Sequence, residues 1–138
     1  MTRTPVKTVL ATVAAVMIGS AALTAPAEAG GSISLTLTPK NQKQENAMKA
    51  GLLIYGVVNH VQNGGSIKQF GQNNMAGIAQ NGGGNFGVVH QEGDGHVGTL
   101  QQNGNGNAYG IFQFGKNTND NVVQNGNGGT GTTFSFGW

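Results

Sequence analysis

A glutamine returns every 11 residues through the second half of this chain. The six glutamines are Gln69, Gln80, Gln91, Gln102, Gln113 and Gln124. A branched aliphatic residue stands two positions before each of them: Ile67, Ile78, Val89, Leu100, Ile111 and Val122. A glycine stands two positions after each of them: Gly71, Gly82, Gly93, Gly104, Gly115 and Gly126. Three residue types that keep one spacing over six copies predict stacked copies of one small unit.

Each copy has the alternating pattern of a β-strand, as in Asn74, Ala76, Ile78 and Gln80. The glycines and asparagines between these segments tolerate positive φ and favour tight turns. Asparagine follows the glutamine in every second copy, and phenylalanine or glutamate follows it in the others, so the true period is 22 residues. The sequence therefore predicts an all-β fold: a β-solenoid over residues 65–126, with strand-turn-strand coils that place residue i over residue i+22.

Stacking in this register explains why glutamine lies on the same face as the aliphatic residues. An unpaired amide in a dry interior costs about 1–3 kcal/mol, whereas amides stacked about 4.8 Å apart can bond to one another. We expect Gln69, Gln91 and Gln113 to form one ladder, and Gln80, Gln102 and Gln124 to form a second. Asn74, Asn85 and Asn107 are expected to add to these assembly ladders. The aliphatic columns are expected to form a thin core between them.

The same pattern predicts self-assembly. Three coils are close to the minimum for an independent solenoid, and each end presents unpaired backbone groups that another copy can complete. Asp120 falls on the inward face of the last coil, where a charge is costly unless it is paired. We interpret Asp120 as a possible brake on assembly, because natural sheets use inward charges to blunt their edges.

Residues 1–29 have the features of a secretory signal peptide. Arg3 and Lys7 give a positive start, Val9 to Leu23 is mostly apolar, and Ala27-Glu28-Ala29 is a small-x-small cleavage site. A membrane anchor fits less well because the apolar stretch is short and interrupted. We therefore expect a secreted, extracellular protein without stable membrane insertion.

Residues 30–64 precede the repeats. Ser32 to Thr38 alternates polar and apolar residues, which predicts a short strand. Thr38-Pro39 suggests the start of a helix that ends before Gly64 and caps the solenoid. A strand through Leu52 to Tyr55 is the alternative, since glycine at two nearby positions weakens a helix.

Residues 127–138 end in alternating aromatic residues, Phe134, Phe136 and Trp138. This pattern predicts a closing strand or an aromatic cap. It is also similar to the last strand of an outer-membrane barrel, but the repeats are too polar to supply an outward apolar band.

The segment from Gln69 to Gln80 fits the curlin repeat, Q-x-G-x-x-N-x-A-x-x-x-Q, at every fixed position. Over residues 65–126 the chain resembles a curlin-family subunit. The resemblance implies secretion through an outer-membrane pore, partnership with a nucleator and other curlin-type subunits, and a surface amyloid that serves adhesion and biofilm. Asn85 and Asn107 replace the family's serine, and its alanine survives only as Ala76. These departures leave the roles of major subunit, nucleator and accessory component open.

Other classes of function find little support in the residues. Five lysines against four acidic residues beyond position 29 form no basic stripe for nucleic acid. No carboxylate or cysteine is expected to join His60, His90 and His96 into one metal site, and Gly93-Asp94-Gly95 is a single turn rather than a calcium repeat. We expect no metal, no cofactor and no catalytic group. The runner-up function is a monomeric binding module that presents the outward Phe86, Val88, Phe112 and Val123 to a partner, and an enzyme ranks third.

Overall fold

The computed structural model of the chain describes residues 30–59 and 64–138. The expected signal peptide, residues 1–29, lies outside the described residues. The described part contains one helix, α2 (Gln42–Val58), and a first strand, β1 (Ser32–Leu37). The strands that follow are β2 (Gly65–Phe70), β3 (Met75–Asn81), β4 (Phe86–Asp94), β5 (Val97–Asn103), β6 (Ala108–Lys116), β7 (Asn119–Asn125) and β8 (Thr130–Gly137).

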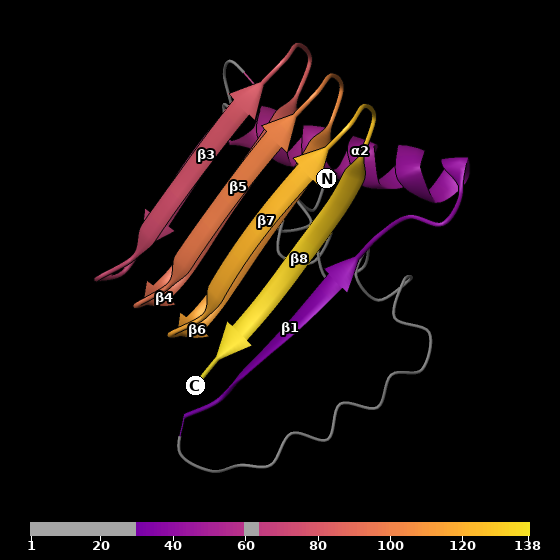
Figure 1. The fold of residues 1–138 in the computed structure, drawn as a ribbon. Helices are drawn as coiled ribbons and strands as arrows, with labels where there is room; N and C mark the ends of the chain where they lie inside the picture. Colours follow the sequence, from indigo (N-terminus) through magenta and orange to yellow (C-terminus); the bar gives the residue numbers. More distant parts are fainter. Residues whose placement is uncertain (1–29, 60–63) are drawn as a thin grey trace, which may run out of the picture.

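Strands β2 to β8 wind into a β-solenoid, which confirms the predicted fold (Figure 1). Successive strands alternate between two sheets, one with the order β1-β8-β6-β4-β2 and the other with the order β3-β5-β7. Parallel pairing sets Gln69 beside Gln91 and Gln80 beside Gln102. Residue i therefore lies over residue i+22, as the double repeat predicts.

The turn glycines let successive coils approach closely. Gly82 has a φ of +113°, a conformation that L side chains rarely adopt. A Cβ atom at Gly82 would also collide with the carbonyl oxygen of Gly104 in the next coil. Only a residue without a side chain fits this position, so the spacing of the glycines follows from the spacing of the coils.

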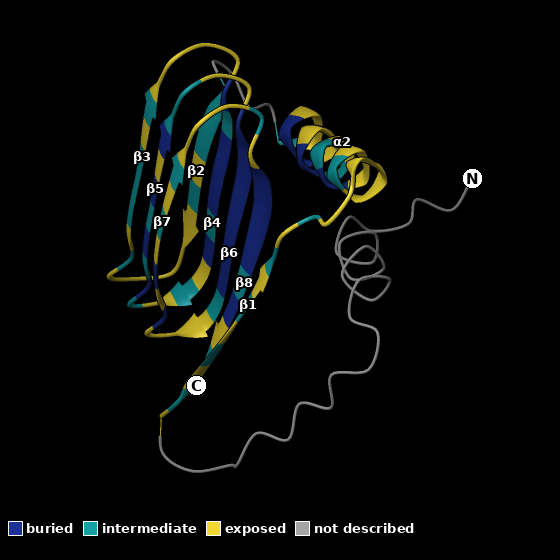
Figure 2. Cartoon of the chain, turned by 45° about the vertical axis from the view of Figure 1, so that its right-hand side comes forward, coloured by how far each residue is buried: buried dark blue, intermediate teal, exposed yellow. Residues whose placement is uncertain are grey.

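A thin apolar core lies between the two sheets. Val89, Leu100 and Ile111 are almost fully buried there together with Tyr109, and Ile78 and Val122 pack against them. The remaining predicted core residue, Ile67, lies on the edge strand β2 and is 43% exposed. Figure 2 shows that burial is deepest in the middle strands and decreases toward β2 and β3.

The helical interpretation of residues 42–58 agrees with the structure, but the predicted start of the helix is wrong. Asn41, rather than Thr38, is the N-cap, and its side chain accepts a hydrogen bond from the Gln44 amide. The Gln44 side chain in turn accepts from the Lys40 amide at 2.8 Å. This reciprocal pair satisfies two amides that a start at Pro39 would leave to solvent.

The helix lies across the outer face of the five-stranded sheet rather than over an end of the solenoid (Figure 2). Met48, Leu52 and Tyr55 pack on Val88 and Phe112 to form a second apolar cluster. The end of the five-stranded sheet is closed instead by β1, which pairs antiparallel with β8. Of the two interpretations of residues 127–138, the structure has the strand: β8 continues the coil in parallel with β6.

Candidate functional site

The glutamines of the five-stranded sheet form a continuous ladder of amide bonds. Gln69 Nε2 donates to Gln91 Oε1 at 2.8 Å, and Gln91 Nε2 donates to Gln113 Oε1 at 2.7 Å. Gln91 and Gln113 are completely buried. The second amide hydrogens of Gln91 and Gln113 go to the carbonyl oxygens of Met75 and Val97 on the opposite strands. The ladder therefore joins successive coils and also ties the two sheets together.

The glutamines of the three-stranded sheet form the second ladder. Gln80 Nε2 donates to Gln102 Oε1 and Gln102 Nε2 donates to Gln124 Oε1, both at 2.8 Å. Gln80 and Gln102 also donate to the carbonyl oxygens of Gly64 and Phe86. The structure thus brings together all six glutamines in the two columns that the sequence predicts.

Both ladders have the same direction. Every amide donates toward the later coil, so the first coil presents acceptors: no donor in the described part of the chain reaches Oε1 of Gln69 or Gln80. Likewise, among residues 30–59 and 64–138, Gln124 Nε2 has no acceptor. The solenoid is therefore chemically polar, with open acceptors at one end and an open donor at the other.

Asp120 closes the donor end of the first ladder. Serine stands at position 135, where the next glutamine of the column would lie, and Gln113 Nε2 donates to Asp120 Oδ2 at 2.8 Å. Asp120 Oδ1 accepts from the hydroxyls of Ser135 at 2.9 Å and Ser34 at 3.5 Å. Asp120 points inward as expected, and these three hydrogen bonds compensate for the burial of its carboxylate.

The three corner asparagines differ from the expected amide ladder. Asn74, Asn85 and Asn107 each accept a backbone N–H from the next coil and donate to a glycine carbonyl in its turn. For Asn85 these partners are the Asn107 amide at 3.0 Å and the Gly104 carbonyl at 2.8 Å. At this corner, main-chain groups of the next coil lie closer to the amide than another asparagine side chain does. These residues therefore stabilise the turns.

His96 occupies the same corner column between Asn74 and Thr118. It is completely buried, and its Nδ1 atom lies 2.8 Å from the Thr118 hydroxyl. A ring can replace asparagine here because it still pairs with the residue one coil later. His96 is therefore a structural member of the corner column.

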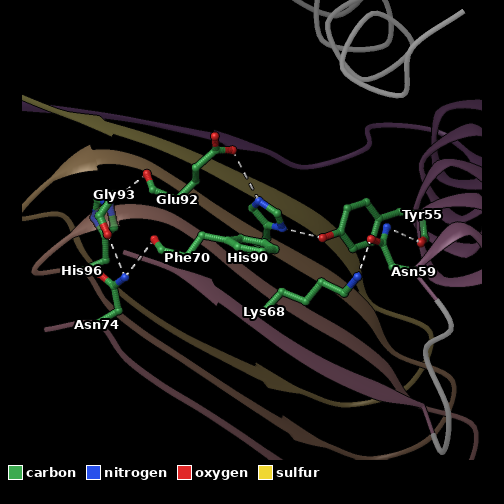
Figure 3. A network of polar contacts seen from close by, with 9 residues as sticks. All are labelled: Tyr55, Asn59, Lys68, Phe70, Asn74, His90, Glu92, Gly93 and His96. Carbon is green, nitrogen blue, oxygen red and sulfur yellow. Dashed lines mark hydrogen bonds and ion pairs between the residues drawn. The ribbon is translucent and has the colours of Figure 1, made fainter. Parts of the chain in front are cut away.

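The outer face of the five-stranded sheet contains a polar contact that sequence reasoning missed (Figure 3). The Tyr55 hydroxyl and His90 Nδ1 share a hydrogen bond of 2.6 Å, and Lys68 Nζ donates to Asn59 Oδ1 at 2.6 Å. Burial raises the pKa of Tyr55 to about 12. No repeat links Tyr55 to His90, so only the docking of α2 reveals the pair.

The same docking covers much of the surface that a binding module would use. Val88 is completely buried and Phe112 is 2% exposed, both beneath α2. Phe86 is partly buried against the same cluster. Of the four outward residues named from the sequence, Val123 alone is strongly exposed, at 53%.

Histidines and acids do not gather into a metal site in the part of the chain that the structure describes. His90 lies on the outer face of the five-stranded sheet, beside Tyr55. His96 is buried in an inner corner, so the two histidines lie on different faces, as expected. His60 lies outside the described residues. Among the described helices none has both the length and the apolarity needed to cross a membrane.

Comparisons of the chain with family models, curated proteins and solved structures find no match.

Proposed function

We propose that the chain is a secreted structural subunit that stacks end to end into a curlin-like surface fibre. The observation that carries this proposal is the uniform direction of the two glutamine ladders. Open acceptors at Gln69 and Gln80 and an open donor at Gln124 are chemically complementary, so one molecule satisfies the end of another.

The first coil adds apolar and backbone support to this proposal. Its edge strands β2 and β3 each pair on one side only. Ile67 is 43% exposed, and Phe70 and Met75 on the same strands are also exposed. Unpaired strand edges with apolar side chains favour addition of further strands, and a stacked copy would bury both.

The biological setting follows the curlin resemblance. The signal peptide would direct export, an outer-membrane pore and a nucleator would act as partners, and the fibre would serve adhesion and biofilm. We propose the same stacking for a major, a nucleating or an accessory subunit.

The test uses the chain without residues 1–29, released from denaturant and incubated at rest. We expect thioflavin-positive fibres whose diffraction has a meridional reflection at about 4.8 Å, the spacing of stacked strands. A chain that stays monomeric at high concentration, with the β-sheet content of the solenoid, would refute the assembly function.

A further inference from the structure

The two sheets of the solenoid end at different levels. Strand β8 extends the five-stranded sheet beyond the last coil strand of the three-stranded sheet, β7, and β1 extends it by one more strand. Among the described residues, no strand of the three-stranded sheet lies beyond β7, although Asp120 on β7 still reaches Ser135 on β8 and Ser34 on β1. The donor end of the molecule is therefore a step rather than a flat face.

The inward side chains change character at this step. The columns that contain Ile111 and Gln113 continue as Thr133 and Ser135 on β8, and then as Thr36 and Ser34 on β1. These hydroxyls pair with each other at 3.1 Å and 2.6 Å. Thr133 and Ser135 are buried, whereas Thr36 and Ser34 are exposed. Hydroxyl groups suit both levels, because they bond to one another and also tolerate water where leucine or isoleucine does not.

The 11-residue repeat determines which strand of a second copy fits the step. Each further repeat adds one strand, and successive strands alternate between the two sheets. One molecule has seven coil strands, β2 to β8, and the last of them, β8, lies in the five-stranded sheet. The next strand in the series falls on β7, in the three-stranded sheet. A copy in the same orientation would instead bring its β2 to the five-stranded sheet.

We propose that a second copy of this chain docks on the step after a half-turn about the solenoid axis, with its β2 on β7 and its β3 on β8, and that β1 leaves β8 to admit it. This inference rests on the proposed assembly function. It specifies the docking surface, the register and the segment that must move.

The register places complementary groups together. Gln69 of the added copy lies beside Gln124 in the same register as Gln124 lies beside Gln102. The open Nε2 donor of Gln124 therefore meets the open Oε1 acceptor of Gln69. Ile67 of the added copy then lies on Val122 and covers it. Gly65 lies on Asp120, where the absence of a side chain leaves the bonded carboxylate undisturbed.

Other arrangements fit less well. Without the half-turn, a copy docked on β8 leaves one strand missing from the three-stranded sheet, so that β7 and the next strand lie about 9.6 Å apart, twice the spacing of paired strands. Docking on β6 and β7 requires removal of β8, whose Phe134 and Phe136 stack on Phe112 and Phe114. Front-to-front docking sets acceptor against acceptor at Gln69.

Strand β1 is the element that can leave. It is the one strand of the five-stranded sheet whose only pairing is antiparallel, and it lies at the edge of that sheet. Its inward residues Ser34 and Thr36 are exposed, so its departure uncovers little apolar surface on the inner face. On the outer face, departure removes Leu37 from the apolar cluster beneath α2. In the single molecule β1 acts as a cap on the edge of β8.

A disulfide lock tests the departure of β1. The chain contains no cysteine, and Ser34 and Ser135 are direct partners in the antiparallel pair. In the Ser34→Cys/Ser135→Cys variant, we expect the oxidised form to elongate fibres at least tenfold more slowly than the same protein after reduction. The two single variants, treated with the same oxidant and reductant, are the controls.

The outcomes separate the two proposals. Equal elongation by the oxidised and reduced forms, with fibres from the unmodified chain, overturns the departure of β1 and leaves the stacking function intact. Absence of fibres from both the unmodified chain and the reduced variant overturns the stacking function and this inference with it.

Intermolecular cross-linking tests the half-turn. The proposed register sets Asn125 beside Phe70 of the added copy, whereas docking on β6 and β7 sets Asn125 beside Asn81. Asn125→Cys chains are mixed with Phe70→Cys chains or with Asn81→Cys chains, assembled and oxidised. We expect several-fold more cross-linked pairs in the first mixture, and an excess in the second would overturn the half-turn.

Helical reconstruction of the fibres is a second test of the half-turn. Three and a half coils correspond to a rise of about 17 Å per molecule, with a rotation of about 180° in addition to the twist of the coil. The helix α2 would then lie on alternating sides of the fibre. A purely translational stack, with every α2 on one side, would contradict the half-turn.

Discussion

The Nε2 atom of Gln113 donates to Oδ2 of Asp120 at 2.8 Å, and so a carboxylate completes a ladder of amides at the level where the glutamines stop. The first ladder ends inside the molecule, while the second remains open at Gln124. One end of the solenoid therefore has one closed column and one open column. Because of this asymmetry, the contribution of each ladder to stability and assembly can be measured separately.

Replacement of Asp120 with alanine removes the acceptor shared by Gln113 and Ser135. We expect Asp120→Ala to lower the free energy of unfolding by about 1–3 kcal/mol, the cost of leaving buried polar groups unpaired. Asp94→Ala is the matched control, because Asp94 is exposed and accepts from the Gln72 amide in a turn. Denaturant titration of both variants checks the difference, and equal losses would show that burial is not the cause.

Glutamine at the middle of the second ladder is expected to control both folding and assembly. Gln102→Leu keeps the apolar bulk but removes the amide between Gln80 and Gln124. We expect this variant to lose about 1–3 kcal/mol of stability and to form fibres more slowly. Gln101→Leu, one position along the same strand on the exposed face, is the control. Thioflavin kinetics identical for Gln102→Leu and the unmodified chain would remove the ladder from the mechanism.

Two adjacent glycines of one turn are expected to respond oppositely to alanine. Gly82 has a positive φ, and a Cβ atom there would collide with the Gly104 carbonyl, whereas Gly83 has room for a Cβ atom. Gly82→Ala is expected to cost at least about 1–3 kcal/mol through backbone strain. Gly83→Ala is expected to be neutral, or to stabilise by up to about 1 kcal/mol by restricting the unfolded chain. Thermal unfolding of the pair checks this prediction, which similar values for the two would contradict.

The Tyr55 phenol is expected to make the docking of α2 sensitive to alkaline pH. Burial raises its pKa from 10.0 to about 12, so the folded protein holds this proton more tightly than the unfolded chain. The resulting stabilisation is complete below pH 10 and is lost as the pH rises toward about 12. Tyr55→Phe should therefore show a weaker decline in stability over this interval.

The same variant has a second readout at neutral pH. It loses the hydrogen bond to His90, which is expected to lower the free energy of unfolding by about 0.5–1.5 kcal/mol. Burial also raises the pKa of Tyr109, which is present in both proteins and cancels in the comparison. Parallel declines of the two proteins above pH 10 would exclude Tyr55 as the titrating group.

The sequence alone predicts the solenoid, because each coil obeys a local rule that repeats. Alternation in Asn74 to Gln80 determines which side chains point inward, and the change of residue after each glutamine distinguishes the two strands of a coil. Parallel stacking in register then follows because residues 22 positions apart are of the same kind and stack best on one another. The pairing of Gln69 with Gln91 and of Gln80 with Gln102 confirms this prediction.

Other features depend on contacts between segments that no repeat relates. The sequence does not indicate that Asn85 bonds main-chain groups rather than another asparagine, since this depends on the path of the turn. Nor does it predict that Asn41 caps α2, because Thr38-Pro39 has an equally good local pattern. Each choice is decided by which polar groups come within reach once the coils have formed.

The periodic sequence by itself determined the coil and its register, because both follow from the same short pattern applied repeatedly. Only the tertiary structure decided where the coil stops. Docking of α2 buries Val88 and Phe112, pairing of β1 covers β8, and Asp120 meets Gln113 across the thin core. These contacts join residues far apart in the sequence, and their geometry exists only after the chain has closed on itself.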